Sequence, residues 1–352
     1  MEKETTRKGA GPLETPQGVV LHIADLRVVF HTYVGTVHAL SGIDLDLREG
    51  KITGLAGETG CGKSVTAKAV MQLLPSTAEV LSGRILFGGE DLVRKTPSEM
   101  DAIRGKRIGM IFQNPRAALN PLFTVEEQLY FLLHRHEHLG RKEARKRSLA
   151  LLEAVRMGGA KKRLRSYPFE LSTGMCQRVM IAMGLACSPK LFIADEPTTG
   201  LDVTVQAQVL ELFKHLVYEV GSTALLITHD LGVIAETSDY MGVMYGGRMV
   251  EFGTTEDLIE HTLHPYTQGL LRSSFTGEDD DELHYIPGVV PDLRRPPSGC
   301  VFEARCAVCV EECRVSVPDM IEVENGHRVA CFQAGAAGIA DGGKAGSTRG
   351  ER

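Results

Sequence analysis

Short apolar runs separated by polar residues predict a sheet of buried parallel strands. Four such runs are too short for buried helices and are bounded by polar residues or glycine; they cover residues 52–56, 108–112, 191–194 and 224–228. Residues 19–30 are rich in apolar and β-branched side chains, and residues 43–48 alternate with period two, as half-buried antiparallel strands do. Hairpins are predicted at 82–92 and 240–252. The pattern predicts an α/β fold with a mixed sheet core and an antiparallel β-subdomain.

Helical periodicity is concentrated in the middle of the chain and predicts a helical subdomain at about 115–172. Apolar stripes run through residues 127–139 and 142–157. His134 and His138 share one face of the first predicted helix at the i, i+4 spacing of a metal pair, but no third ligand lies at a suitable offset. We interpret these histidines as part of a solvated helix face.

Residues 57–64 read Gly-Glu-Thr-Gly-Cys-Gly-Lys-Ser and match the P-loop pattern G-x-x-x-x-G-K-[ST]. The match lies between a predicted buried strand and a stretch, Val65 onward, that can form a helix, which is the context that the motif requires. Glycines allow successive backbone N–H groups to point at phosphate. Lys63 would reach the β- and γ-phosphates, and the Ser64 hydroxyl would bind Mg²⁺. The sequence therefore predicts a site for a nucleotide phosphate.

Polar side chains end three of the predicted buried strands. Gln113 follows one strand, Asp195 and Glu196 end another, and His229 follows a third. Because parallel α/β sheets place their ligand contacts at the carboxyl ends of strands, we expect these residues to line the edge that carries the P-loop. Asp195 suits Mg²⁺ coordination, and Glu196 suits orienting a water molecule.

Composition narrows the class of protein. The chain has 352 residues, a net charge of −6 and 43% hydrophobic residues, which is ordinary for a globular protein and argues against a broad nucleic-acid surface. No stretch approaches the length of a membrane-spanning helix, and the first residues lack the apolar core of a signal peptide. We expect a cytoplasmic protein with a disordered leader at 1–18 and a disordered tail at 335–352.

Five of the eight cysteines lie between positions 300 and 331. In a reducing compartment such a group is more typical of a metal site than of disulfides. Thiolates suit both zinc and iron–sulfur clusters, and the C-x-x-C spacing of Cys306 and Cys309 would by itself favour zinc.

Taken together, the motifs from about Val19 to Thr255 resemble the ATP-binding subunits of ABC transporters: the P-loop, Gln113, the Leu-Ser-Thr-Gly-Met run at 171–175, the Ile-Ala-Asp-Glu-Pro run at 193–197, and His229. The resemblance implies a P-loop ATPase in which Glu196 is the catalytic carboxylate, with Gln113 and His229 beside it. It implies Mg²⁺ at Ser64, Gln113 and Asp195. The residues that it assigns to ATP are Tyr33, Gly57, Glu58, Thr59, Gly60, Cys61, Gly62, Lys63, Ser64, Val65, Ser172, Thr173, Gly174 and Asp202.

Two details of that resemblance stay open at the level of sequence. Tyr33 would stack on adenine, with Phe30 as its rival. The signature motif of the family usually has glycine where this chain has Thr173, so we expect an altered but working half-site that contacts ATP held by the other subunit.

The C-terminal part resembles the extension of oligopeptide/dipeptide importer ATPases of the D type. The matching runs are His-Pro-Tyr-Thr-Gln-Gly-Leu-Leu at 264–271, Ile-Pro-Gly at 286–288, and Gly-Cys-x-Phe-x-x-Arg-Cys at 299–306. This implies an ATPase domain at 19–262 and a Cys-rich extension at 263–334. By the resemblance Cys300, Cys306, Cys313 and Cys331 would hold a [4Fe–4S] cluster, and Cys309 is an extra thiol that could replace one of them.

The family further implies partners and a location. These are a related ATPase subunit as heterodimer partner, two transmembrane permease subunits, and indirectly an extracytoplasmic substrate-binding protein. The chain would lie on the cytoplasmic face of the membrane. Cargo other than peptides (a nickel chelate, an opine or a glycoside) fits the same subgroup. A soluble repair or translation ATPase is the rival class, but the long coiled-coil insertion or second P-loop of those proteins is not found here.

Overall fold

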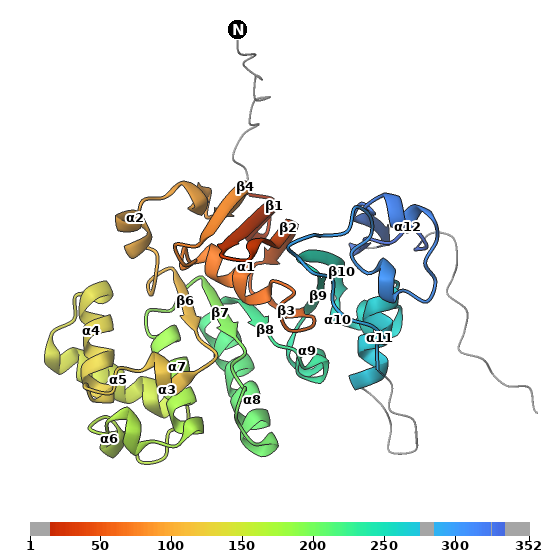
Figure 1. Cartoon of the computed structure of the whole chain (residues 1–352). Helices are drawn as coiled ribbons and strands as arrows, with labels where there is room; N and C mark the ends of the chain where they lie inside the picture. Colours follow the sequence, from red (N-terminus) through yellow and green to blue (C-terminus); the bar gives the residue numbers. More distant parts are fainter. Residues whose placement is uncertain (1–14, 275–284, 325, 335–352) are drawn as a thin grey trace, which may run out of the picture.

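The computed structural model describes residues 15–274, 285–324 and 326–334, and its centre is one mixed sheet (Figure 1). The strand order is β11-β12-β10-β9-β3-β8-β7-β6, in which the five strands from β9 to β6 run parallel and β10, β12 and β11 continue antiparallel. The strands are β3 (Ile52–Ala56), β6 (Ile108–Ile111), β7 (Leu191–Asp195), β8 (Thr223–Ile227), β9 (Tyr240–Tyr245), β10 (Arg248–Thr254), β11 (Ile321–Glu324) and β12 (His327–Val329). The four apolar runs singled out in the sequence are thus the parallel strands β3, β6, β7 and β8.

A second, antiparallel sheet packs over the first and has the order β2-β1-β4-β5. Its strands are β1 (Val19–Thr32), β2 (Gly35–Arg48), β4 (Ala78–Phe87) and β5 (Glu90–Asp91). The buried positions of the second half of β2 are Ile43, Leu45 and Leu47, which confirms the predicted alternation. The hairpin expected at 82–92 forms around Gly88 and Gly89, although its first strand begins earlier, at Ala78.

Helices cover both faces of the mixed sheet because neighbouring residues of its buried strands point to opposite sides. Phe192 and Ala194 face the helical subdomain, whereas Leu191 and Ile193 face α1 and the antiparallel sheet. The helices are α1 (Lys63–Val70), α2 (Pro97–Asp101), α3 (Pro115–Ala118), α4 (Val125–Glu137), α5 (Arg141–Ala154), α6 (Ala160–Arg163), α7 (Thr173–Leu185), α8 (Val203–Val220), α9 (Leu231–Thr237), α10 (Thr255–Glu260), α11 (Pro265–Ser274) and α12 (Glu312–Val315), with single 3₁₀ turns at 92–94, 168–170 and 303–305.

The helical subdomain contains the helices that the periodicity predicts. Helix α5 stops at Ala154, three residues before the predicted end, because Arg156 adopts a positive φ of 53°. His138 is the left-handed residue that ends α4, and the His134 ring stacks on Tyr130. These contacts agree with a solvated helix face. The predicted leader and tail fall mostly in 1–14 and 335–352, which lie outside the described residues.

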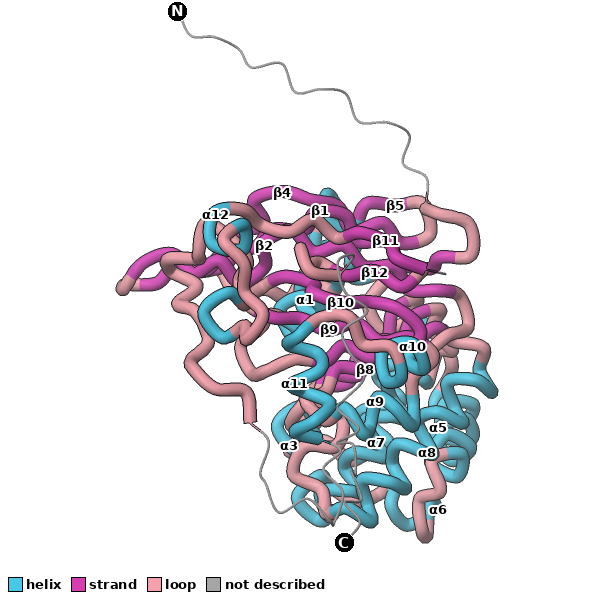
Figure 2. The backbone as a smooth tube through the Cα atoms, turned by 90° about the vertical axis from the view of Figure 1, so that its right-hand side faces the viewer, coloured by secondary structure: helices cyan, strands magenta, loops and turns pink. Residues whose placement is uncertain are grey.

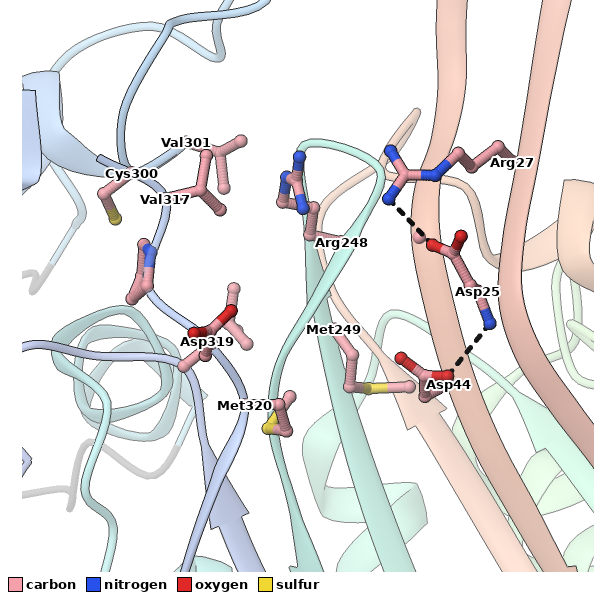
Figure 3. Close-up of a pocket in the computed structure, with 14 residues that line it drawn as sticks. Asp25, Arg27, Asp44, Arg248, Met249, Cys300, Val301, Val317, Asp319 and Met320 are labelled. Carbon is pink, nitrogen blue, oxygen red and sulfur yellow. Dashed lines mark hydrogen bonds and ion pairs between the residues drawn. The ribbon is translucent and has the colours of Figure 1, made fainter. Parts of the chain in front are cut away.

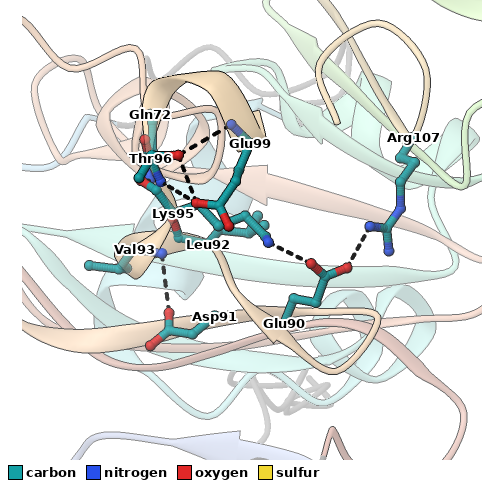
Figure 4. A network of polar contacts seen from close by, with 9 residues as sticks. All are labelled: Gln72, Glu90, Asp91, Leu92, Val93, Lys95, Thr96, Glu99 and Arg107. Atoms are coloured by element: carbon teal, nitrogen blue, oxygen red, sulfur yellow. Dashed lines mark hydrogen bonds and ion pairs between the residues drawn. The ribbon is translucent and has the colours of Figure 1, made fainter. Parts of the chain in front are cut away.

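A polar network joins the antiparallel sheet to the start of β6 (Figure 4). Glu90 accepts from Arg107 at 2.6 Å and pairs with Lys95 at 2.5 Å. These two donors, Lys95 first, hold the pKa of the Glu90 carboxyl below its usual range. Thr96 and Glu99 form a capping box that begins α2 beside this network. The pair between Glu90 and Arg107 therefore ties the antiparallel sheet to the residue directly before β6.

The C-terminal extension continues the mixed sheet instead of forming a separate unit. Its strand β12 pairs with β10, as the view in Figure 2 shows, and β11 pairs with β12 in turn. Glu251 of β10 is fully buried, and its carboxylate lies 2.9 Å from Nε2 of His327 in β12. The same carboxylate accepts the backbone N–H groups of Leu263 and His264. A single buried glutamate therefore fastens both the beginning and the last strand of the extension to the ATPase core.

Candidate functional site

The P-loop crosses from β3 to α1 in a conformation that only glycine can adopt. Gly57 has φ of +139° and Gly62 has φ of +111°. A Cβ at Gly57 would lie 2.2 Å from the carbonyl oxygen of Met244, and one at Gly62 would lie 2.9 Å from that of Ala39. The predicted strand, glycine loop and helix are thus all present, and Gly62, the N-cap of α1, provides no side-chain cap for the N–H groups of the first turn.

Lys63 and Ser64 are held at the start of α1 by neighbouring groups. The Lys63 ammonium donates to the carbonyl oxygen of Glu58 at 3.1 Å and also to that of Gly57. The Ser64 hydroxyl donates to Oδ1 of Asp195 at 2.8 Å. Burial raises the pKa of the Asp195 carboxyl, and the hydrogen bond from Ser64 opposes that rise. Two of the three residues assigned to Mg²⁺, Ser64 and Asp195, therefore lie in contact although they are far apart in the chain. The third, Gln113, donates to Glu196 instead.

The other strand-end residues gather around Glu196. Gln113 Nε2 donates to Glu196 Oε2 at 2.7 Å, and His229 Nδ1 lies 3.5 Å from Oε1. Thr199 adds a hydroxyl donor at 2.8 Å, which the sequence did not single out. Glu196 itself has a positive φ of 47°, a strained conformation for a residue that is not glycine. The expectation that these strand ends line one edge is confirmed.

The two aromatic candidates for adenine differ sharply in exposure. Tyr33 occupies the two-residue turn between β1 and β2, and its side chain is fully exposed. Phe30 lies within β1 and packs against the apolar core beneath the antiparallel sheet. Phe30 is half-buried whereas Tyr33 is fully exposed, so Tyr33 is the more accessible of the two rings. Its role in stacking on adenine stays a prediction.

The signature segment begins α7 as expected. Ser172 is the N-cap, and its hydroxyl accepts the N–H of Met175 at 3.3 Å. Thr173 is the first helical residue and has a negative φ, so threonine fits here without backbone strain. A Cβ on Gly174 would come within 2.9 Å of Val205, near the start of α8 where Asp202 is the N-cap. Among the described residues, no hydrogen bond or ion pair joins 172–174 to the P-loop of the same chain.

The comparisons with known proteins agree with this geometry. The family described as ABC transporter matches residues 40–199, and the family described as oligopeptide/dipeptide transporter, C-terminal region, matches residues 250–313. The chain is 47% identical to the dipeptide transport ATP-binding protein DppD of Bacillus subtilis, over 89% of this chain and 94% of that protein. This chain belongs to the ATP-binding subunits of oligopeptide and dipeptide ABC importers. It is accordingly an ABC ATPase.

Other members of this importer ATPase family match over similar lengths. The oligopeptide transport ATP-binding protein OppD of Escherichia coli is 43% identical over 92% of this chain and 96% of its own length. Among solved structures, a dimeric ATP-binding cassette in a post-hydrolysis state bound to ADP and Pi superposes with a TM-score of 0.60 at 25% identity, covering 67% of this chain and 98% of that chain. The ABC ATPase fold predicted from sequence is thus confirmed.

The described helices of this importer ATPase do not include a membrane span. Within the described part of the chain no helix is both long and apolar enough to cross a bilayer.

A cavity of about 230 Å³ lies where the antiparallel sheet meets the extension (Figure 3). Arg27 and Asp25 pair at 2.7 Å on its sheet side, and Cys300 lines the opposite side. No P-loop residue lines this cavity, so it is separate from the nucleotide site.

The cysteines of the extension lie near one another, and none forms a disulfide. The backbone N–H of Cys300 donates to the carbonyl oxygen of Cys313 at 2.7 Å. Burial raises the pKa of the Cys300 thiol to about 11, and three neighbouring cysteines add to the rise: Cys313, Cys331 and Cys306. Over the described residues, however, no three His, Cys, Asp or Glu side chains are arranged around a single metal position.

Two residues beside the P-loop were not anticipated from sequence. Tyr266 of α11 accepts the backbone N–H of Glu58 through its hydroxyl at 2.9 Å. Arg305 of the Cys-rich segment donates to the Glu58 carboxylate at 2.9 Å. In the sequence both stand only within runs that resemble the family's extension, and no local pattern indicates which residue they touch.

Proposed function

We propose that this importer ATPase hydrolyses ATP as one of two subunits that close around two ATP molecules and thereby drive peptide uptake. The observation that carries the proposal is the convergence of the P-loop, Asp195 and the Glu196 cluster at one sheet edge. Chemistry at that edge needs phosphate binding, a metal site and a carboxylate near an attacking water, and each has a residue in place.

Each residue would have a distinct task. Lys63 and the P-loop amides would bind the phosphates, while Ser64 and Asp195 offer the hard oxygen ligands that Mg²⁺ prefers. Bound Mg²⁺ would neutralise charge on the β- and γ-phosphates. Glu196 would orient the attacking water, because Gln113, Thr199 and His229 fix its carboxylate from three sides.

Within the described residues no hydrogen bond or ion pair joins the signature segment to the P-loop of the same chain, which supports a site shared between two subunits. Ser172, Thr173 and Gly174 would reach the γ-phosphate of ATP bound to the partner ATPase, with Asp202 at the interface. The similar solved cassette bound to ADP and Pi is a dimer, which supports this arrangement. We propose a related, non-identical chain as the partner, two permease subunits above it, and attachment to the cytoplasmic face of the membrane.

The test is ATP hydrolysis by the full chain reconstituted with its permease and partner subunits in vesicles. Peptide and binding protein should stimulate phosphate release, and Lys63→Ala should abolish ATP binding by this subunit. Lys142→Ala is the matched control, since that lysine is exposed on α5 and away from the P-loop. Equal ATP binding by Lys63→Ala and the control would refute the proposed site.

We further propose that Cys300, Cys306, Cys313 and Cys331 hold an iron–sulfur cluster. The support is the chemistry of four neighbouring thiols that form no disulfide, and the family resemblance of the segment. Cys309 is a competing ligand because it is a further thiol without a disulfide and lies next to Cys313. Visible absorbance with iron and sulfide analysis on anaerobically purified protein tests this. A colourless protein that carries zinc would overturn the cluster and leave the ATPase unaffected.

A further inference from the structure

The backbone and side chain of Glu58 in the P-loop are held on three sides. Its carbonyl oxygen accepts from Lys63 at 3.1 Å within the loop. The other two contacts come from the C-terminal extension: its N–H donates to the Tyr266 hydroxyl, and its carboxylate accepts from Arg305. Glu58 is therefore the point where the extension meets the phosphate-binding loop.

Arg305 is well placed to act as a fixed donor. Its side chain is 6% exposed, against 26% for Glu58. Besides Glu58, the guanidinium donates to the Tyr245 hydroxyl at 3.1 Å and to the carbonyl oxygens of Pro287 and Ile286 at 3.0 Å each. A guanidinium held by several acceptors loses little further freedom when it binds a carboxylate, which makes its position accurate.

Tyr266, like Arg305, is held in place by surrounding side chains. It is fully buried and packs against Tyr245 and Phe302, with ring centroids 4.6 and 5.3 Å away. Phe302 comes from the same Cys-rich segment as Arg305, so the two contacts to Glu58 share one rigid aromatic support. Neither contact depends on an exposed or freely rotating side chain.

We propose that Arg305 and Tyr266 are positioning residues for ATP binding, and that the Cys-rich extension sets the affinity of the P-loop through Glu58. Glu58 follows Gly57, whose carbonyl oxygen is an acceptor of the Lys63 ammonium. A shift of the Glu58 backbone would therefore move the lysine that reaches the phosphates and the amides that follow it. The effect falls on binding and not on hydrolysis, because neither residue touches the Glu196 cluster.

This proposal rests on the ATP-binding role of the P-loop proposed above. The experiment is titration of the purified full chain with a fluorescent ATP analogue and Mg²⁺, followed by ATPase assays of the reconstituted transporter. Arg305→Met and Tyr266→Phe should each weaken binding about tenfold, the scale of losing a hydrogen bond to a charged or buried group. In turnover, the KM for ATP should rise by a similar factor while kcat changes less than about twofold.

Matched variants separate positioning from general support of the fold. Arg294→Met is the control, because Arg294 belongs to the same extension and pairs with Asp292 at 2.7 Å on its exposed surface. Its ATP affinity should equal that of the wild type. Arg305→Lys keeps the charge and should restore part of the affinity. In a Glu58→Gln background, Arg305→Met should cost much less than in the wild type, because the shared partner has already been altered.

The outcomes distinguish the two proposals. If the wild-type chain does not bind the analogue, the P-loop assignment itself fails. If it binds and both Arg305→Met and Tyr266→Phe bind within twofold of it, only the positioning role is overturned. A loss of affinity in Arg305→Met that is unchanged by Glu58→Gln would also overturn it, since the effect would not pass through Glu58. Tyr266→Phe removes only a hydroxyl, so it keeps the proposal testable should Arg305→Met fold poorly.

Discussion

Two glutamate–histidine pairs in this importer ATPase differ in burial. One lies open at the candidate nucleotide site, and the other is buried where the extension joins the core. Glu196 and His229 lie 3.5 Å apart with side chains 17% and 61% exposed, whereas Glu251 and His327 lie 2.9 Å apart with side chains 0% and 7% exposed. The buried pair has protein donors on both carboxylate oxygens. The open pair lies at the sheet edge, where substrate and water can reach it. The same residue types therefore dock the extension in one place and, in the function proposed above, serve catalysis in the other.

The largest expected effect follows from breaking the buried pair. Glu251→Gln should lower the free energy of unfolding by about 3 kcal/mol, because His327 and two backbone N–H groups would lose a charged acceptor in a fully buried position. Denaturant unfolding of the full chain measures it. Glu260→Gln, on the exposed end of α10, is the control and should change stability by less than about 0.5 kcal/mol. Equal stability of the two variants would contradict the role of Glu251 in attaching the extension to the ATPase core.

The corresponding glutamate-to-glutamine change at Glu196 should lower the rate of ATP hydrolysis and leave the free energy of unfolding unchanged. Glu196→Gln should reduce ATP turnover of the assembled transporter by about a hundredfold, the scale of removing a general base. Its side chain keeps one oxygen for Gln113 and Thr199, so ATP should remain bound and the ATPase dimer should accumulate. Phosphate release and size-exclusion chromatography measure the two effects. Rapid turnover in this variant would mean that another group activates the water.

Acid should weaken the buried region around Glu251. His264 is buried beside Glu251, and burial lowers its pKa from 6.5 to about 4. The unfolded chain then binds the proton more readily, so the contribution of His264 to stability is complete above pH 6.5 and is lost as the pH falls toward 4. We expect a loss of about 2 kcal/mol between pH 7.5 and pH 5.

The matched variant for that pH dependence is His264→Asn. Nδ1 of His264 accepts the N–H of Tyr266 at 3.0 Å, and the asparagine oxygen can replace that acceptor without titrating. Unfolding curves at the two pH values should therefore differ less in the variant, by about the same 2 kcal/mol. An unchanged difference would assign the acid sensitivity to other groups.

The smallest effect concerns the unusual signature residue. Because Thr173 adopts a helical conformation at the start of α7, Thr173→Gly should loosen that turn and lower turnover about two- to threefold, as the helix propensity of glycine suggests. The assay needs the complete transporter, since the signature would act on the partner's ATP. Unchanged turnover would show that this position does not influence the half-site.

Sequence reasoning succeeded where short motifs coincide with strand ends. The P-loop pattern and the polar residues after β6, β7 and β8 were sufficient to predict that Ser64, Asp195, Gln113 and Glu196 converge, because parallel strands bring their carboxyl ends together. The sequence did not show that Tyr33 is fully exposed while Phe30 is half-buried, and the structure adds this difference. The roles of these residues stay predictions until the variants above are measured.

The extension could not be predicted in the same way. Its strands β11 and β12 are only four and three residues long, too short for a periodic pattern. The contact between Arg305 and Glu58 joins residues 247 positions apart, and nothing near either residue indicates the other. The boundary predicted after residue 262 therefore gave no indication that the sheet continues into the extension or that the extension contacts the P-loop.

The distance along the chain between Glu58 and Arg305 also determines when their contact can form during translation. Ribosomes add about 5–20 residues per second, so Arg305 is made roughly 12 to 50 s after Glu58, which lies 247 positions earlier. A nascent chain can form its nucleotide loop early but acquires both outer contacts of Glu58 only after Arg305 has been made. A chain released before residue 305 would therefore lack the arginine that holds the loop.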